Sequence, residues 1–201
     1  MTLRAIFFDL GGVILRTEYQ TPRERLAERL NMTYEDISKL VFEAETARKA
    51  SLGEISVEEH WLAVTRKLRL PDSEAEAIRI EFFAGDVIDR DLLDFIRSLR
   101  PRYRTGVISN AWGDLRDYIV KHQFDDAFDT LIISAEIGMM KPQPEVYQWA
   151  LKQAQVEANE AAFVDDMPKN IEAANALGMH GIIFRDPAQV KENLRALFNH
   201  R

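Results

Sequence analysis

Five short apolar runs, separated by amphipathic stretches, constrain the fold of this chain more than any other feature. The runs are RAIFF (4–8), RTGVI (104–108), TLII (130–133), AAFV (161–164) and GIIF (181–184). Near-continuous apolar runs of this length are typical of strands that are buried on both faces of a parallel sheet. Helical patterns lie between them at 90–99, 114–121, 145–154, 169–177 and 187–198. This alternation predicts an α/β fold, a doubly wound (Rossmann-like) parallel sheet of about five strands.

The segment 16–85 interrupts this rhythm, because it contains no strand-like run. The sequence predicts four helix starts in this segment, at Thr21, Thr33, Ser56 and Asp72. Thr21 and Ser56 each begin a Ser/Thr-x-x-Glu capping box. We therefore expect an all-helical subdomain at 16–85, inserted into an α/β core that is formed by 1–15 and 86–201.

Composition excludes several classes of function. The 201 residues carry 26 Lys and Arg against 33 Asp and Glu, and an acidic balance without a basic run argues against a nucleic-acid partner. No apolar run approaches the ~18 residues of a membrane helix, and the N-terminus lacks the pattern of a secretion signal. The absence of cysteine excludes disulfides, zinc-thiolate sites and cysteine nucleophiles. These features predict a cytoplasmic protein that does not act on membranes.

Polar side chains follow four of the predicted strands, at the edge where ligands bind in an open parallel sheet. They are Asp9, Ser109 with Asn110, Lys141 after a short loop that begins at Ser134, and the pair Asp165 and Asp166. Taken singly, an Asp after a strand usually caps a turn, and a lone Lys is usually a solvated charge. Two adjacent carboxylates at a buried strand end, however, repel each other unless a cation is present. Hard oxygen ligands favour Mg²⁺.

This pattern resembles the haloacid dehalogenase superfamily of hydrolases over the whole chain. Its motifs stand here as FFDLGGV (7–13), VISN (107–110), GMMKPQPEVY (138–147) and FVDDMPKNIEAANALGM (163–179). Within the superfamily, the third and fourth motifs are most similar to bacterial sugar-phosphate phosphatases and to the N-terminal phosphatase domain of soluble epoxide hydrolases. The segment 16–85 resembles the helical cap of one subclass.

The resemblance implies a catalytic role for three of these residues. Asp9 would attack phosphorus and become an aspartyl-phosphate, which splits one displacement into two easier ones. Ser109 and the backbone N–H of Asn110 would hold the phosphoryl oxygens. Lys141 would neutralise both the nucleophile and the charge that develops on the phosphoryl group.

The resemblance also implies a magnesium site. Asp9, Asp166 and the backbone carbonyl of Gly11 would bind Mg²⁺, with Asp165 acting directly or through water. Asn170, one helical turn beyond Asp166, would orient the site without contacting the metal.

Position 11 departs from the family pattern. The family usually has a second Asp two residues after the nucleophile, which protonates the leaving oxygen and later activates water, whereas this chain has Gly11. General acid–base catalysis typically contributes ~10²–10⁴-fold to a rate. The substitution is compatible with a slow phosphatase, a substrate with a good leaving group, a proton donor from the cap, or an inactive ligand-binding protein. Some active relatives, including sugar-1-phosphate phosphatases, also lack this acid.

Two other classes of protein share part of these motifs. Haloacid dehalogenases also lack the acid, since halide needs no proton, but they do not have the paired acidic fourth motif that Asp165 and Asp166 supply here. Response-regulator receiver domains combine Asp, Ser/Thr and Lys in a different order along the chain. Phosphate chemistry is therefore favoured, and a 2-haloacid dehalogenase remains the alternative.

The expected substrate is a small phosphate ester, a sugar phosphate or a similar metabolite. Trp112 is the best candidate to line its site, with core packing an equal alternative. Trp61 and His60 are expected to pack inside the cap. The sequence does not indicate an oligomeric state.

Overall fold

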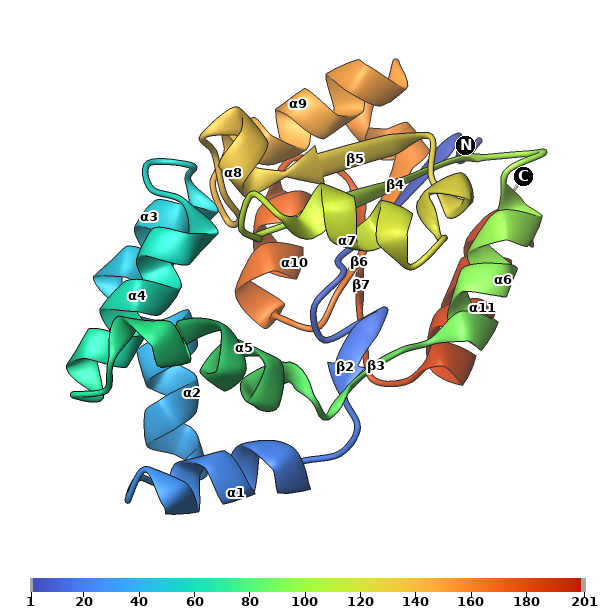
Figure 1. Cartoon of the computed structure of the whole chain (residues 1–201). Helices are drawn as coiled ribbons and strands as arrows, with labels where there is room; N and C mark the ends of the chain where they lie inside the picture. The colour runs from blue at the N-terminus through green and yellow to red at the C-terminus, as the bar shows by residue number, and fades with distance from the viewer. Residues whose placement is uncertain (1, 200–201) are drawn as a thin grey trace.

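A parallel sheet of five strands forms the centre of the computed structural model, which describes residues 2–199 (Figure 1). Its strands are β1 (Ala5–Phe8), β4 (Arg104–Ser109), β5 (Thr130–Ile133), β6 (Ala161–Asp165) and β7 (His180–Ile183). They lie in the order β5-β4-β1-β6-β7, and each neighbouring pair is parallel. The predicted α/β fold is confirmed.

Both faces of the sheet are covered by helices, which explains why its strands are apolar throughout. In β1, Ile6 and Phe8 face one hydrophobic cluster while Ala5 and Phe7 face another. The first cluster includes residues of α6 (Arg90–Leu99), α7 (Leu115–Lys121) and α11 (Pro187–Asn199). The second includes residues of α9 (Pro144–Ala154) and α10 (Pro168–Ala176). The molecule is therefore a three-layer sandwich at this level.

The strand order brings the predicted site residues to one edge of the sheet. β1 lies between β4 and β6, with Phe8 paired to Val107 on one side and to Val164 on the other. Because all three strands run the same way, the residues that follow Phe8, Ile108 and Val164 meet at one edge of the sheet.

Helices α1–α5 form a separate group on one side of the sheet (Figure 1). They are α1 (Thr21–Arg29), α2 (Tyr34–Phe42), α3 (Glu45–Ser51), α4 (Val57–Lys67) and α5 (Ala75–Phe83). Their apolar faces build a hydrophobic cluster of their own, which includes Leu26, Ile37, Trp61 and Phe82. We call α1–α5 the helical insertion.

The side-chain caps expected at the four predicted helix starts of the insertion are confirmed at two and wrong at the other two. Thr33 and Ser56 each form a capping box, with Asp36 and Glu59 respectively. Thr21 is instead the first residue of α1, after Gln20, which makes no side-chain cap. Asp72 lies in a short 3₁₀ helix (Asp72–Glu74), where its carboxylate accepts hydrogen bonds from Arg66. It therefore does not cap α5.

Four short elements were missed from the sequence. Helix α3 lies between two predicted helices, and α8 (Ser134–Ile137) follows β5 directly. Strands β2 (Leu15–Thr17) and β3 (Asp86–Ile88) pair as an antiparallel ribbon, at the expected boundaries of the insertion. At three residues each, the two strands are too short to show a periodic pattern.

A buried arginine joins this ribbon to the insertion. Arg23 of α1 donates to the carbonyl of Phe82, to Thr17 Oγ1 and to Asp86 Oδ1, and its guanidinium lies 3.9 Å from the centre of the Phe82 ring. Thr17 in turn donates to Asp86 at 2.7 Å. One cation therefore connects α1, α5 and both strands of the ribbon.

Candidate active site

Asp9 lies directly after the central strand, at the edge where β4 and β6 also end. Its backbone N–H donates to the carbonyl of Val164 at 2.8 Å, which continues the β1–β6 pairing past the end of the strand. Its carboxylate accepts a hydrogen bond of 2.7 Å from the backbone N–H of Leu10. Only 8% of the residue is exposed. Asp9 is thus a nearly buried carboxylate with one face toward the end of the sheet.

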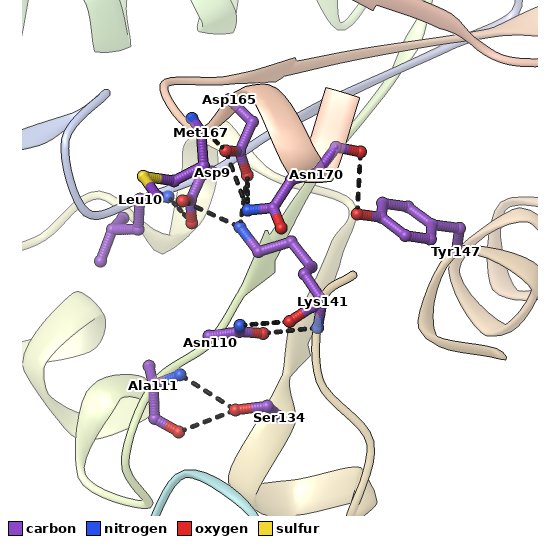
Figure 2. Close-up of polar contacts among 10 residues, drawn as sticks. All are labelled: Asp9, Leu10, Asn110, Ala111, Ser134, Lys141, Tyr147, Asp165, Met167 and Asn170. Carbon is purple, nitrogen blue, oxygen red and sulfur yellow. Dashed lines mark hydrogen bonds and ion pairs between the residues drawn. The ribbon is translucent and has the colours of Figure 1, made fainter. Parts of the chain in front are cut away.

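The ammonium group of Lys141 joins two of the carboxylates (Figure 2). Lys141 Nζ lies 2.8 Å from Asp9 Oδ2 and 2.7 Å from Asp165 Oδ2, and the lysine is only 2% exposed. The Asn110 side chain fixes the lysine main chain, since Lys141 N–H donates to Asn110 Oδ1 at 2.7 Å and Asn110 Nδ2 donates to the Lys141 carbonyl at 2.8 Å. This clamp was missed from the sequence, which suggested only a backbone role for Asn110.

Asp165 is fully buried and held by four hydrogen-bond contacts. Besides Lys141, both of its oxygens accept from Asn170 Nδ2 at 3.0 Å, and Oδ1 accepts from the backbone N–H of Met167 at 2.8 Å. The main chain of Asn170 is held in turn, because its carbonyl accepts from the Tyr147 hydroxyl at 3.0 Å (Figure 2). Tyr147 was within the third motif, but the sequence gave no reason to assign it a role.

The charges of this cluster do not balance within the protein. Burial raises the pKa of Asp9 to about 6, against the opposing effect of Lys141 and with a further contribution from Asp165. Burial and the neighbouring Asp165 also raise the pKa of Asp166. One ammonium therefore faces three carboxylates, and an additional cation would favour their ionised forms.

The three carboxylates are close enough to share a metal ion. Asp9, Asp165 and Asp166 each offer an oxygen, and these oxygens lie within 4.8 Å of one another. Asp165 already accepts hydrogen bonds from Lys141, Asn170 and Met167. Asp166, by contrast, is partly exposed and forms no ion pair with a described residue. A set of carboxylate oxygens fits a hard divalent cation such as Mg²⁺.

Two adjacent glycines shape the wall of this cluster. Gly12 has a φ of +76°, and a Cβ there would lie 2.3 Å from Asp166 Oδ2, so only glycine leaves room for that carboxylate. A Cβ on Gly11 would meet no atom within 4 Å, and Gly11 is not among the residues with positive φ. The position where the family resemblance leads us to expect an acid is therefore open to solvent.

Ser109 and Trp112 occupy the loop that leaves β4. Ser109 is the last residue of the strand and is 5% exposed. Trp112 contacts the helical insertion, with ring centroids 4.8 Å from His60, 5.9 Å from Trp61 and 6.4 Å from Phe42. Between them, Ala111 N–H donates to Ser134 Oγ at 3.0 Å, which ties this loop to the start of α8.

Comparison with known proteins identifies the family. The model for the family described as "haloacid dehalogenase-like hydrolase" matches residues 3–178. This chain is a haloacid dehalogenase-like hydrolase. The resemblance that its four motifs suggested is thereby confirmed.

The hydrolase is similar to proteins that differ greatly in length. The sesquiterpene phosphatase astK of Aspergillus oryzae is 27% identical over 98% of this chain and 97% of its own. The bifunctional epoxide hydrolase 2 of Rattus norvegicus is 32% identical over 55% of this chain, but the matched part is 21% of that relative's length.

The fold of the hydrolase also matches crystal structures of the family. A family member from Bacteroides thetaiotaomicron, in complex with magnesium and inorganic phosphate, has a TM-score of 0.75 and 21% identity over 91% of this chain and 94% of its own. Among residues 2–199, the hydrolase has no helix that is both long and apolar enough to span a membrane.

Proposed function

We propose that this hydrolase is a Mg²⁺-dependent phosphatase that cleaves a small phosphate ester through an aspartyl-phosphate on Asp9. The observation that carries the proposal is the position of Lys141 Nζ, 2.8 Å from Asp9 and 2.7 Å from Asp165, beside a third carboxylate. The Lys141 ammonium favours the ionised form of the Asp9 nucleophile, against the effect of burial, and places positive charge where a phosphoryl group would arrive. The phosphatase among its relatives that matches over nearly full length supports the same chemistry.

The reaction would proceed in two displacements. In the first, an Asp9 oxygen forms a bond to phosphorus while the bond from phosphorus to the organic oxygen breaks, and that oxygen leaves with the electron pair. In the second, water attacks phosphorus and loses a proton to solvent, the Asp9–phosphorus bond breaks with its electron pair returning to the carboxylate, and inorganic phosphate leaves. Lys141, the Ser109 hydroxyl and the Asn110 backbone N–H would stabilise the charge on the phosphoryl oxygens in both steps.

Asp9, Asp166 and the Gly11 carbonyl would hold the magnesium ion, with Asp165 acting directly or through water. The ion would supply positive charge that offsets the mutual repulsion of the carboxylates and of the phosphate. Asp166 is the better candidate for direct contact, because Asp165 already accepts hydrogen bonds from Lys141, Asn170 and Met167. Asn170 would orient Asp165 without touching the metal.

The decisive experiment is phosphate release from a panel of aryl, sugar and alkyl phosphates, with Mg²⁺ and with EDTA. Release that requires Mg²⁺ and is lost in Asp9→Asn supports the proposal, and Asp117→Asn, an exposed residue of α7, is the matched control. Equal release by wild type and Asp9→Asn would overturn the nucleophile. Halide release from 2-haloacids would support the dehalogenase alternative. Ligand binding without any turnover would support an inactive binding protein, which the missing acid at Gly11 keeps as a candidate.

A further inference from the structure

Three of the four loops that hold the candidate site residues also carry a large apolar side chain that is partly open to solvent. Trp112 follows Asn110 by two residues, Met140 directly precedes Lys141, and Met167 directly follows Asp166. Met167 is 42% exposed, although its backbone N–H is bound to the buried Asp165. An apolar side chain therefore lies one or two residues along the chain from a polar site residue in each of these three loops.

The helical insertion extends this apolar border. Phe42, which is 51% exposed, stacks on Trp112 with an interplanar angle of 24°. Phe83 packs edge-on against the same indole, with centroids 6.2 Å apart. An aromatic surface therefore continues from the loop after β4 onto the insertion.

Cations of the insertion beside this surface are already paired. Arg23, whose guanidinium lies 5.8 Å from the centre of the Phe42 ring, forms an ion pair with Asp86. Arg79 of α5 forms an ion pair with Asp114, in the same loop as Trp112, and a longer one with Glu76. A polyol substrate needs polar side chains to satisfy its hydroxyl groups, and a site that leaves buried polar groups unpaired loses affinity. An apolar surface gains binding energy instead from the apolar area that a ligand covers.

We propose that the organic part of the substrate is apolar, an aryl or long-chain alkyl group, and that Trp112, Met140, Met167 and Phe42 bind it. This inference rests on the proposed phosphatase function and narrows the substrate expected from the sequence. The phosphate lies at Asp9 and Lys141, and the apolar group extends along the exposed faces of Met167 and Phe42. Trp112 and Phe83 also hold the insertion against the core, so replacing them could disturb the fold. The test therefore replaces Phe42 and Met167, which are both about half exposed.

The test uses 4-alkylphenyl phosphates with methyl, butyl and octyl chains, because these share nearly the same leaving-group acidity. In the wild type we expect kcat/KM to rise with chain length, by up to about fourfold for each methylene group that becomes buried. Phe42→Gln and Met167→Gln should flatten this rise, measured in each protein as the ratio of octyl to methyl kcat/KM. Trp149→Gln is the matched control, because Trp149 is 39% exposed but lies on α9; its slope should equal that of the wild type.

A binding measurement keeps the inference independent of turnover. Butyl-, hexyl- and octylphosphonic acid, below the concentrations at which they form micelles, should bind with a dissociation constant that falls as the chain lengthens. The fall should shrink in Phe42→Gln and Met167→Gln and persist in Trp149→Gln. Equal affinity for all three phosphonates, or tighter binding of a sugar phosphate than of octylphosphonate, would overturn the inference. Equal kcat/KM for the methyl, butyl and octyl phenyl phosphates would overturn it while leaving the phosphatase proposal intact.

Discussion

The open space beside Gly11 makes a direct test of the missing acid possible. Without a proton donor there, the departing oxygen leaves unprotonated, so the wild-type rate should depend steeply on leaving-group acidity. Aryl phosphates, and next sugar-1-phosphates, should react faster than primary alkyl phosphates. Gly11→Asp should raise kcat/KM for alkyl esters by up to ~10²-fold and change aryl esters little. A new side chain meets no atom within 4 Å of its Cβ, so the variant should fold normally.

The quantity to measure is the ratio of alkyl to aryl kcat/KM in each protein, because a general loss of activity cancels in it. A wild type that already handles both classes equally well would contradict the prediction. Such a result would indicate that the proton comes from another group, most simply one on the helical insertion.

The neighbouring glycine should behave in the opposite way. Gly12→Ala places a methyl group 2.3 Å from Asp166 Oδ2 at a φ of +76°, so both the backbone and the carboxylate must shift. The positive φ alone costs about 1 kcal/mol. We expect Gly12→Ala to lose most of its Mg²⁺ response in a thermal melt, and Gly11→Ala to keep it. Equal responses in the two variants would show that Asp166 does not need its present position.

At the level of elements, the ribbon of β2 and β3 depends on one buried cation. Arg23→Met removes the partner of Asp86, whose pKa burial already raises. We expect a loss of about 3 kcal/mol in the free energy of unfolding, measured with urea at neutral pH. Arg23→Lys should recover only part of it, since the lysine cannot reproduce the contacts to Phe82, Thr17 and Asp86 together.

The pH dependence of this variant follows from the same pair. Without Arg23 the pKa of Asp86 should rise further, so the folded state binds a proton that the unfolded state has lost. Stability then falls as pH rises above the ordinary range of an Asp carboxyl group. The deficit of Arg23→Met should therefore be smaller at pH 4 than at pH 7, and Asp86→Asn in the same chain should remove that difference. A deficit that does not change with pH would contradict the assigned pair.

The elements that could be predicted from the sequence are those whose signal is local. The five buried strands are mostly apolar runs, the helix start predicted at Thr33 lies three residues from its capping partner, and the capping box predicted at Ser56 is complete within four residues. The helix cap predicted at Asp72 was wrong because its carboxylate accepts a hydrogen bond from Arg66, a partner that no local pattern reveals. The ribbon was missed because each strand has three residues and depends on a partner far along the chain.

The same distinction applies to the site. Strand ends identified Asp9, Lys141 and Asp165, which the structure brings into contact. The clamp of Asn110 on the Lys141 main chain, and the contact of Tyr147 with Asn170, require the fold before they can be seen. The sequence left open whether Trp112 lines the site or packs in the core, and its ring contacts in the structure are with the insertion.

For the molecule as a whole, Mg²⁺ should act as a stabilising ligand. An ion at 100 times its dissociation constant adds about 2.7 kcal/mol to the free energy of unfolding, which corresponds to a rise in Tm of roughly 5–10 °C for a chain of this size. Asp166→Asn should reduce the rise more than Asp165→Asn. The measurement is a thermal melt in MgCl₂ and in NaCl of the same ionic strength. A Tm indifferent to Mg²⁺ in all three proteins would contradict the metal site.

The central position of β1 has a consequence for how the protein is made. Ala5 pairs with Arg104 and with Ala161, so the first strand to leave the ribosome must wait for partners that are synthesised much later. Such non-local pairing slows folding and exposes both edges of an apolar strand in the meantime. A nascent chain that ends before β6 leaves Asp9 without Asp165 and leaves one edge of β1 unpaired. Enzyme activity and protection from aggregation should therefore arise together, late in translation, when β6 pairs with the free edge of β1.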